Sequence, residues 1–587
     1  MRVEPKDQKT LIDAAAGRIK ADLAIHNIKF VNVFSGEIYP AVVYIKDGFT
    51  VHVDHFSSAL EQDGAAEFID GGGCYLIPGF VDAHAHIESS MLVPYRFAQS
   101  VAQSGTTTII TDPHELANVL GERAVVYMHD ASENVPMRQL IDIPSCVPAV
   151  PGLETAGAEF FADTIRRLAK LPRVVGLAEV MDFVGVANAD TRMMDIIEAA
   201  RECGLYLQGH APIGAGRQLS AYIVGGPHTC HETRVGADAA YKIRNGMAVD
   251  ARQSSMAKNV EQIVSGVRDF KYYDNLCLCT DDRETADNLT LGHMSDVVRS
   301  AVAAGLSGVD AVRCATLNPA RHANLENIGA VAPGFTADML LVDDLAAFNV
   351  RTVIYGGQIV AADGALTVEI DIPSFAIESE NTVTLPALTV DDFRLVSPKA
   401  TAVDVNVLCY PSPVMSLTEC TRITLPVTDG CVDISSDDEL CYVMIINRYG
   451  KGNIIKGVVK GFGLKKGANA STVSHDCHNL CVVYKNPADG YAAVIALSRC
   501  GGGMCHVDGD SVSLLPLPVG GLMTTLPPDE LATATTALKD VLRGCGIISP
   551  NPILRIATMA LPVIPAAKFS DLGFVDVMKK QFIPIFP

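Results

Sequence analysis

The sequence predicts an α/β protein: a (β/α)8 barrel inserted into a small β domain, followed by an α+β domain. Three observations predict this arrangement. A helix, a Gly or Pro break and a short apolar run follow one another repeatedly between residues 76 and 325. The two segments that flank this region are both rich in short strand-like runs. A loose stretch then separates them from a further region of mixed character.

Eight apolar runs that each end near a polar residue are found in the repeating region. Thr106–Thr111 follows a helical stretch and Gly105, and Leu205–Gly209 follows a helix that Gly204 ends. The run from Ile143 to Val150 is the weakest of the eight. About 250 residues is the usual length of a (β/α)8 barrel, so we expect one barrel over residues 76–325.

The small β domain is expected to use both flanks of the barrel. Residues 1–75 contain runs such as LAIHNIKFVNVF, and residues 326–372 contain RTVIYGGQIVAADG. Both alternate apolar and polar side chains, which is typical of strands. We expect the two segments to form one domain, a linker to follow, and residues 387–587 to form a C-terminal α+β domain.

Composition limits the classes of partner. The chain has 587 residues, with 49% hydrophobic and 19% charged, as in a globular protein with a large core. Its net charge of −21 argues against nucleic acid or an anionic membrane surface as a partner. We expect no spanning segment or secretory signal, and reduced thiols for the 16 cysteines. A cytoplasmic homo-oligomer, a dimer, is therefore expected.

Polar residues at the strand ends form the candidate site. In a (β/α)8 barrel, chemistry sits at the C-terminal ends of the strands. If Phe80–His84 is a strand, His84 and His86 point the same way, about 7 Å apart along the chain. Four imidazoles and two carboxylates can hold two divalent ions, and we expect Glu179 to bridge them. The proposed metal ligands are His84, His86, Glu179, His210, His231 and Asp281.

Each of these residues has a simpler interpretation when it is taken alone. The pair of histidines could be solvated or part of a core, His210 could cap a helix, and Asp281 could lie in a solvated turn. The ordered set at strand ends favours the metal site. Two ions can activate a water molecule. Asp281 would then accept its proton and deliver it to a leaving group, so Asp281 and Glu179 are the expected catalytic residues.

Several motifs carry a resemblance to a known family. They are PGFVDAHAHIESSM at 78–91, GTTTIITDPHELANVLG at 105–121, GLAEVMDF at 176–183, GHAP at 209–212, CHE at 230–232, CTDDR at 279–283, GH at 292–293, TVSHDCHN at 472–479 and LPLPVGGLM at 515–523. On these motifs, over nearly its whole length, the chain resembles the bacterial adenine deaminases of the amidohydrolase superfamily. The resemblance implies a purine substrate, with adenine and water giving hypoxanthine and ammonia, and a pair of iron or manganese ions. Zinc is a third candidate metal.

Other residues near the strand ends have two interpretations each. Asp112 and His114 are expected either to bind metal or relay protons, or to orient a ligand imidazole. Candidate supporting or substrate-contacting residues are Asp112, His114, Glu88, Ser89, Ser90 and Asp282. His475, Asp476 and His478 could form a loop over the pocket or hold a domain interface, and we favour the interface.

One departure from the family pattern concerns the substrate. Members of the family tend to read REGS where this chain has Arg252-Gln253-Ser254-Ser255. A deaminase or cyclic-amide hydrolase of another heterocycle is therefore the main alternative function. A catalytically silent binding protein is a weaker alternative, because no expected ligand is missing from the sequence.

Overall fold

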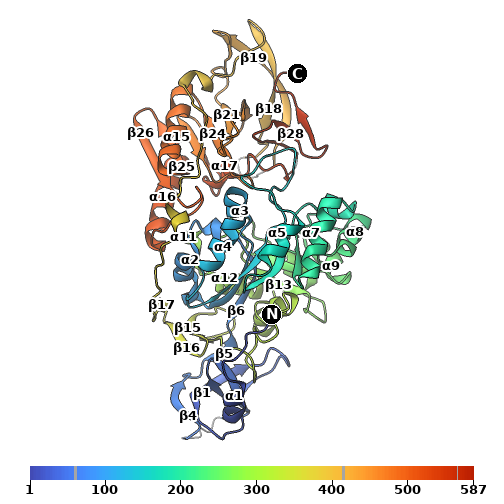
Figure 1. Ribbon diagram of the computed structural model, residues 1–587, viewed down its shortest axis with the longest axis vertical. Helices are drawn as coiled ribbons and strands as arrows, with labels where there is room; N and C mark the ends of the chain where they lie inside the picture. Colours follow the sequence, from blue (N-terminus) through green and yellow to red (C-terminus); the bar gives the residue numbers. More distant parts are fainter. Residues whose placement is uncertain (58–62, 413–416, 565) are drawn as a thin grey trace.

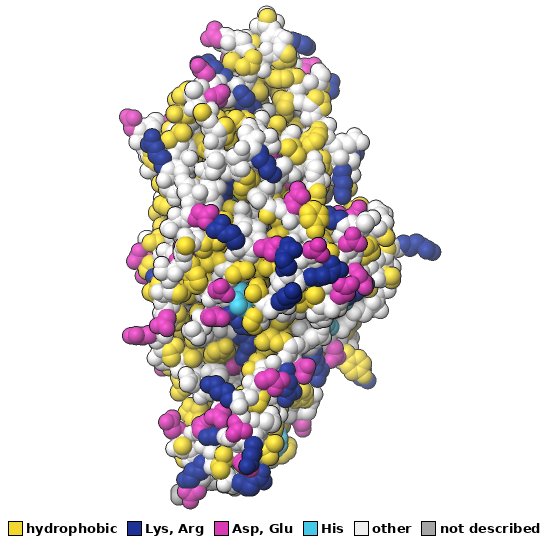
Figure 2. All heavy atoms as spheres, viewed as in Figure 1, with side chains coloured by type: hydrophobic (Ala, Val, Ile, Leu, Met, Phe, Trp, Pro, Cys, Tyr) yellow, Lys and Arg dark blue, Asp and Glu magenta, His cyan; other side chains and the backbone are white. Residues whose placement is uncertain are grey.

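The computed structural model describes residues 1–57, 63–412, 417–564 and 566–587 (Figure 1). The molecule is elongated, with a sheet near the N-terminus at one end, an α/β region in the middle and a second large sheet at the other end. Acidic and basic side chains intermingle over the face shown in Figure 2. No helix among the described residues is both long and apolar enough to cross a membrane.

The first sheet is built from both flanks of the α/β region. Its strand order is β17-β16-β15-β14-β5-β1-β2-β3, and β4 pairs with β1. The flanks meet where β5 pairs with β14, with Ile77 opposite Leu340 in an antiparallel ladder. The elements are α1 (Gln8–Ala15), β1 (Ala21–Val31), β2 (Ile38–Lys46), β3 (Phe49–His55), β4 (Ala65–Asp70), β5 (Tyr75–Pro78), β14 (Met339–Val342), β15 (Val350–Tyr355), β16 (Gln358–Ala362) and β17 (Ala365–Leu366).

A curled parallel sheet forms the middle of the molecule. Strands β6 to β10 lie side by side in sequence order, and β11 to β13 form a second parallel group. A parallel bridge between Ala85 and Asp281 brings the end of β6 beside the end of β13. The strands are β6 (Phe80–Ala85), β7 (Thr106–Thr111), β8 (Arg138–Ile143), β9 (Val174–Val180), β10 (Tyr206–Gly209), β11 (Thr229–Cys230), β12 (Ala248–Arg252) and β13 (Leu276–Cys279).

Helices connect these strands and cover the sheet (Figure 1). Most have one apolar face; Ile196 and Ile197 of α7, for example, are fully buried. The helices are α2 (Pro94–Val101), α3 (His114–Leu120), α4 (Glu122–Asp130), α5 (Ala162–Leu168), α6 (Phe183–Ala187), α7 (Thr191–Glu202), α8 (Arg217–Gly225), α9 (Gly236–Arg244), α10 (Val260–Val267), α11 (Thr285–Leu291), α12 (Met294–Ala303), α13 (Gly308–Cys314) and α14 (Leu317–His322).

The third strand of the parallel sheet lies earlier in the chain than the sequence predicts. The weak run at Ile143 to Val150 is not a strand; β8 spans Arg138–Ile143 and ends where the predicted run begins. Pro144 and Pro148 lie within that run, and proline has no N–H to donate to a sheet. The polar start of β8, Arg-Gln, concealed its strand character.

The C-terminal region contains a second large sheet. Its order is β20-β19-β18-β22-β21-β24-β23-β25-β26, and β27, β28 and β29 form a separate three-stranded sheet. The elements are β18 (Ala402–Cys409), β19 (Glu419–Thr428), β20 (Cys431–Val432), β21 (Leu440–Ile446), β22 (Ile454–Lys460), β23 (Ala468–Ser471), β24 (Leu480–Tyr484), α15 (Pro487–Cys500), β25 (Gly503–Asp508), β26 (Ser511–Pro516), α16 (Pro528–Gly544), α17 (Leu554–Ala557), β27 (Ala567–Phe569), β28 (Phe574–Asp576) and β29 (Gln581–Ile583).

The C-terminal region packs directly on the parallel sheet's helices. Helix α16 contacts α11 and α2, and Leu92 forms a parallel bridge with Thr524. The backbone of Gly520 approaches α3 so closely that a Cβ there would lie 2.3 Å from Leu116 Cδ1. One continuous apolar core therefore joins the two regions. The sixteen cysteines are free thiols and most are buried, as the sequence predicts.

A buried ion pair ties the first sheet to the parallel sheet and yields a stability prediction. Arg138 Nη1 of β8 lies 2.9 Å from Asp338 Oδ2, and the two side chains are only 10% and 4% exposed. Replacing Asp338 with Ala would leave a buried guanidinium unpaired, which should destabilise the protein by about 3–5 kcal/mol. Differential scanning calorimetry should show a clearly lower Tm.

The matched control is Asp343→Ala, which removes a pair with Arg351 whose side chains are 30% and 54% exposed. Solvent screens such pairs, so the Tm should barely change. Equal melting temperatures for the two variants would contradict a structural role for the buried pair.

Candidate metal centre

Six side chains from the ends of the parallel strands converge in one place. His84 lies in β6 and Glu179 in β9; His86, His210 and His231 directly follow their strands, and Asp281 comes two residues after the end of β13. Five of the six side chains are at most 4% exposed, and the sixth, His210, is 18% exposed. The structure thus brings together all six ligands expected from the sequence: His84, His86, Glu179, His210, His231 and Asp281.

Glu179 lies at the centre of this cluster. Its Oε1 is 3.2 Å from His86 Nε2 and 3.7 Å from His84 Nε2. Its Oε2 is 3.1 Å from His231 Nε2 and contacts His210 Nδ1. Burial alone would raise the pKa of Glu179, but His210 and His231 hold it well below its usual range. An ionised carboxylate whose two oxygens face different pairs of imidazoles is the arrangement that a bridging ligand requires.

Asp281 is buried beside His86 and is held by an arginine. Its Oδ1 is 3.5 Å from His86 Nε2, and its Oδ2 is 2.7 Å from Arg252 Nη1. The same guanidinium nitrogen lies 2.7 Å from Glu232 Oε1. Burial favours the neutral acid, yet the charge of Arg252 holds the pKa of Asp281 well below its ordinary value. Arg252 therefore fixes the orientation and the charge of this carboxylate.

The hydrogen bonds at Nδ1 of His84 and His86 favour the tautomer that neutral metal-binding imidazoles have. Gln208 donates its amide N–H to Ala83 O at 2.8 Å, so its oxygen accepts the Nδ1–H of His84 at 2.5 Å. The Nδ1–H of His86 donates to the carbonyl oxygen of Asp112 at 3.0 Å. In neutral rings, both Nε2 atoms then carry lone pairs, which are the atoms that bind metal.

These two lone pairs face one another at a short distance. His84 Nε2 and His86 Nε2 are 3.1 Å apart. Two nitrogen ligands about 2.1 Å from one ion, at angles near 90–110°, would be separated by roughly 3.0–3.4 Å. Burial, and then the charge of His231, lowers the pKa of His84 to about 3, so this ring is neutral at neutral pH. The residues present therefore fit a bound divalent cation.

Asp112 and His114 lie against the same cluster. His114 Nδ1 is 2.9 Å from Asp112 Oδ2, and the rings of His114 and His86 have centroids 4.7 Å apart. Ligand atoms of His86, Asp112, His114 and Glu179 all lie within 4.8 Å of one another. The Asp112 backbone orients His86, while the side chains are also close enough to bind an ion. The geometry is compatible with both interpretations.

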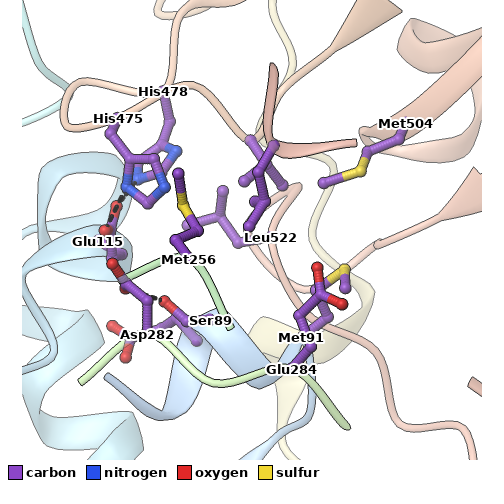
Figure 3. Close-up of a pocket in the computed structure, with 13 residues that line it drawn as sticks. Ser89, Met91, Glu115, Met256, Asp282, Glu284, His475, His478, Met504 and Leu522 are labelled. Carbon is purple, nitrogen blue, oxygen red and sulfur yellow. Dashed lines mark hydrogen bonds and ion pairs between the residues drawn. The ribbon is translucent and has the colours of Figure 1, made fainter. Parts of the chain in front are cut away.

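A pocket of about 460 Å³ opens beside the cluster (Figure 3). Ser89 donates to Asp282 Oδ1 at 2.6 Å, and both line the pocket. Glu88 also lines it; its Oε1 accepts from the Leu116 N–H, and its buried Oε2 has no partner among the described residues. Ser90 is not among the lining residues and donates to Ile87 O instead.

Comparisons with known proteins identify the family. Residues 75–360 match the sequence model of the amidohydrolase family, and residues 415–581 match that of the adenine deaminase C-terminal domain. A curated adenine deaminase of Methanothrix thermoacetophila is 37% identical over 100% of both chains. The chain belongs to the adenine deaminase family. Adenine deaminases of Oleidesulfovibrio alaskensis and Moorella thermoacetica are each 36% identical over 98% of both chains.

In this member of the adenine deaminase family, the C-terminal domain lines the pocket. The sequence favours a domain interface for His475, Asp476 and His478. The loop between β23 and β24 does cross that interface, and His475 and His478 also line the pocket (Figure 3). Asp476 Oδ1 lies 3.8 Å from His114 Nε2. The loop therefore belongs to the site.

Two residues of the site were not predicted in their roles. The carboxylate of Glu115 contacts His475 and His478 of the C-terminal loop. Arg252 forms an ion pair with Asp281. Glu115 directly follows His114 in the DPHE motif, so its place in that motif indicates a residue of the site. Arg252 ends strand β12 as Asp281 follows β13, but nothing in the sequence indicates that the two side chains meet.

Replacing Glu179 with Gln tests the central position of this carboxylate. The change keeps the shape but removes the charge that two pairs of imidazoles face, so the metal bound per chain should fall. Elemental analysis of the purified protein measures it. A metal content equal to that of the unaltered protein would show that Glu179 does not hold an ion.

Proposed function

We propose that this protein hydrolyses adenine to hypoxanthine and ammonia in purine salvage. The similarity to curated adenine deaminases over the full length of both chains carries this proposal. The geometry supports it, because a cluster of four imidazoles and two carboxylates lies beside a pocket, whose wall includes Asp282, the residue directly after Asp281 of the cluster. The family's amidohydrolase match covers the residues of that cluster.

We further propose a closed eight-stranded barrel and a two-ion site. The bridge between Ala85 and Asp281 supports closure. The ions would be manganese or iron, with zinc as a third candidate, because the donor set is nitrogen and oxygen. His84, His86, His210, His231, Glu179 and Asp281 would hold them. When bound, the ions would polarise water and stabilise developing negative charge.

The chain's own residues supply the proton movements. The water oxygen bonds to C6 of the purine, and Asp281 accepts one of its protons. Asp281 delivers this proton to the amine, the C6–N bond breaks and ammonia leaves. The other proton of water ends on ring nitrogen N1, so the atoms balance. Arg252 keeps Asp281 in the ionised form that begins this sequence.

The pocket walls suit a flat aromatic base. Met91 and Met256 from the barrel face Leu522 from the C-terminal domain (Figure 3). Methionine packs well against aromatic rings because its thioether is polarisable and flexible. Glu88 and Asp282, which also line the pocket, offer carboxylate oxygens to the N–H groups at the edge of the base.

A dimer in the cytoplasm is the proposed state of the protein. The free thiols fit a reducing compartment. Light scattering of the purified protein measures the oligomeric state directly.

Replacing Asp281 with Asn should remove the proton acceptor while most metal ligands remain. We expect kcat for adenine to fall by at least ~10²-fold, the low end for general acid–base catalysis. Ammonia release by the manganese-loaded enzyme measures this, and elemental analysis serves as the control. Activity within a factor of a few of the unaltered enzyme would remove Asp281 from this role.

Adenine should be a much better substrate than adenosine or cytosine. Residues of the C-terminal domain, among them His475 and Leu522, form part of the pocket wall, and we expect them to hinder a sugar on N9. Gln253 and Ser254 depart from the family pattern, and Ser254 accepts the N–H of the pocket residue Met256 at 3.1 Å. A heterocycle other than adenine is therefore the second candidate substrate. Comparable ammonia release from all three compounds would contradict the adenine preference.

A further inference from the structure

Two histidines of the C-terminal domain hold one carboxylate at the wall of the pocket (Figure 3). His475 Nδ1 lies 2.5 Å from Glu115 Oε1, and His478 Nε2 contacts Glu115 Oε2. Glu115 belongs to α3, some 360 residues earlier in the chain. The two histidines come from one loop, but their surroundings assign them different roles.

His478 is a fixed hydrogen-bond donor. The backbone N–H of Ser474 donates to His478 Nδ1 at 3.1 Å, so that nitrogen carries a lone pair. The ring's remaining proton must then be on Nε2, where it is donated to Glu115. Burial lowers the pKa of His478, which agrees with a neutral ring. Because its Nε2 carries a proton, His478 anchors Glu115 and does not bind metal at this position.

His475 has one nitrogen held and the other turned away from Glu115. Its Nδ1–H is donated to the Glu115 carboxylate, and no partner for its Nε2 is found in the part of the chain that the structure describes. The side chain is 12% exposed and lines the pocket. A carboxylate that orients one imidazole nitrogen while the other faces a reaction space is the arrangement of an oriented acid–base group.

The charges around His475 favour its protonated form. Burial opposes the charge, but Glu115 raises the pKa of His475 to about 9, with Asp282 and Asp476 contributing in the same direction. At neutral pH the ring therefore starts as a proton donor. Asp281, in contrast, starts as a proton acceptor, so the pocket offers the substrate one group of each kind.

Given the proposed deamination, we infer that His475 is a catalytic acid–base residue that contacts a ring nitrogen of the purine. As the water oxygen bonds to C6, the π electrons of the C6–N1 bond move to N1, which takes a proton from His475 Nε2. Asp281 passes the first water proton to the departing amine. The second water proton leaves the C6 hydroxyl as the carbonyl forms and returns to His475. Glu115 and His478 act as positioning residues.

The test compares two variants of the full-length, manganese-loaded enzyme, His475→Ala and His475→Gln. Gln can form a hydrogen bond but cannot transfer a proton, so both variants should lose at least ~10²-fold in kcat for adenine. Their metal content and Tm should match those of the unaltered enzyme. Added imidazole should restore part of the activity of His475→Ala, because it can occupy the vacated space and supply the proton.

The controls separate this inference from the proposed function. Imidazole should not restore the activity of Asp281→Asn. The activity of the unaltered enzyme with imidazole added measures how far imidazole inhibits by binding the metals, and the rescue data are corrected for it. No turnover of adenine by the unaltered enzyme would reject the proposed function itself. If the unaltered enzyme turns over adenine and the kcat of His475→Gln lies within threefold of its kcat, only the role of His475 would be overturned. Loss of activity without imidazole rescue would also overturn it, because His475 would then be structural.

Discussion

Glu179 organises the whole site through its contacts with the imidazoles on either side of it. Three of the four histidine rings at the strand ends are buried, and without a compensating negative charge any protonated ring there would be costly to bury. The carboxylate divides the rings into two pairs, one for each oxygen. One pair comes from the end of β6, and the other comes from the ends of β10 and β11. The position of Glu179 in β9 therefore links the positions of these four strands.

Residues around the cluster hold its side chains in one protonation state. Gln208 and the Asp112 carbonyl fix the protons of His84 and His86 on the nitrogens that point away from the cluster. Arg252 keeps the carboxylate of Asp281 ionised, because its positive charge lowers the pKa of that group. The Nε2 atoms of His84 and His86 lie 3.1 Å apart, a separation at which both could bind one cation.

Much of the centre could be predicted from the sequence, and the reasons for the omissions are physical. The proposed metal ligands lie at or near strand ends, and the position of a strand end is encoded locally by an apolar run that stops. Strand β8 was misplaced because its buried start is polar, so its pattern resembles a loop. Glu115 and His475 meet across about 360 residues, and no local pattern encodes a contact over that distance. The Arg252–Asp281 pair joins neighbouring strands, but side-chain direction at their ends depends on backbone geometry that the sequence does not reveal.

The pairing of β5 with β14 has a consequence for the synthesis of the protein. About 260 residues separate the two strands, so the ribosome, adding roughly 5–20 residues per second, needs some 13–50 s between them. During that interval the partner edge of β5 is an open row of backbone donors and acceptors, the kind of edge at which chains associate wrongly. The nascent chain must therefore keep β5 covered, by a chaperone or by the growing parallel sheet, until β14 has left the ribosome.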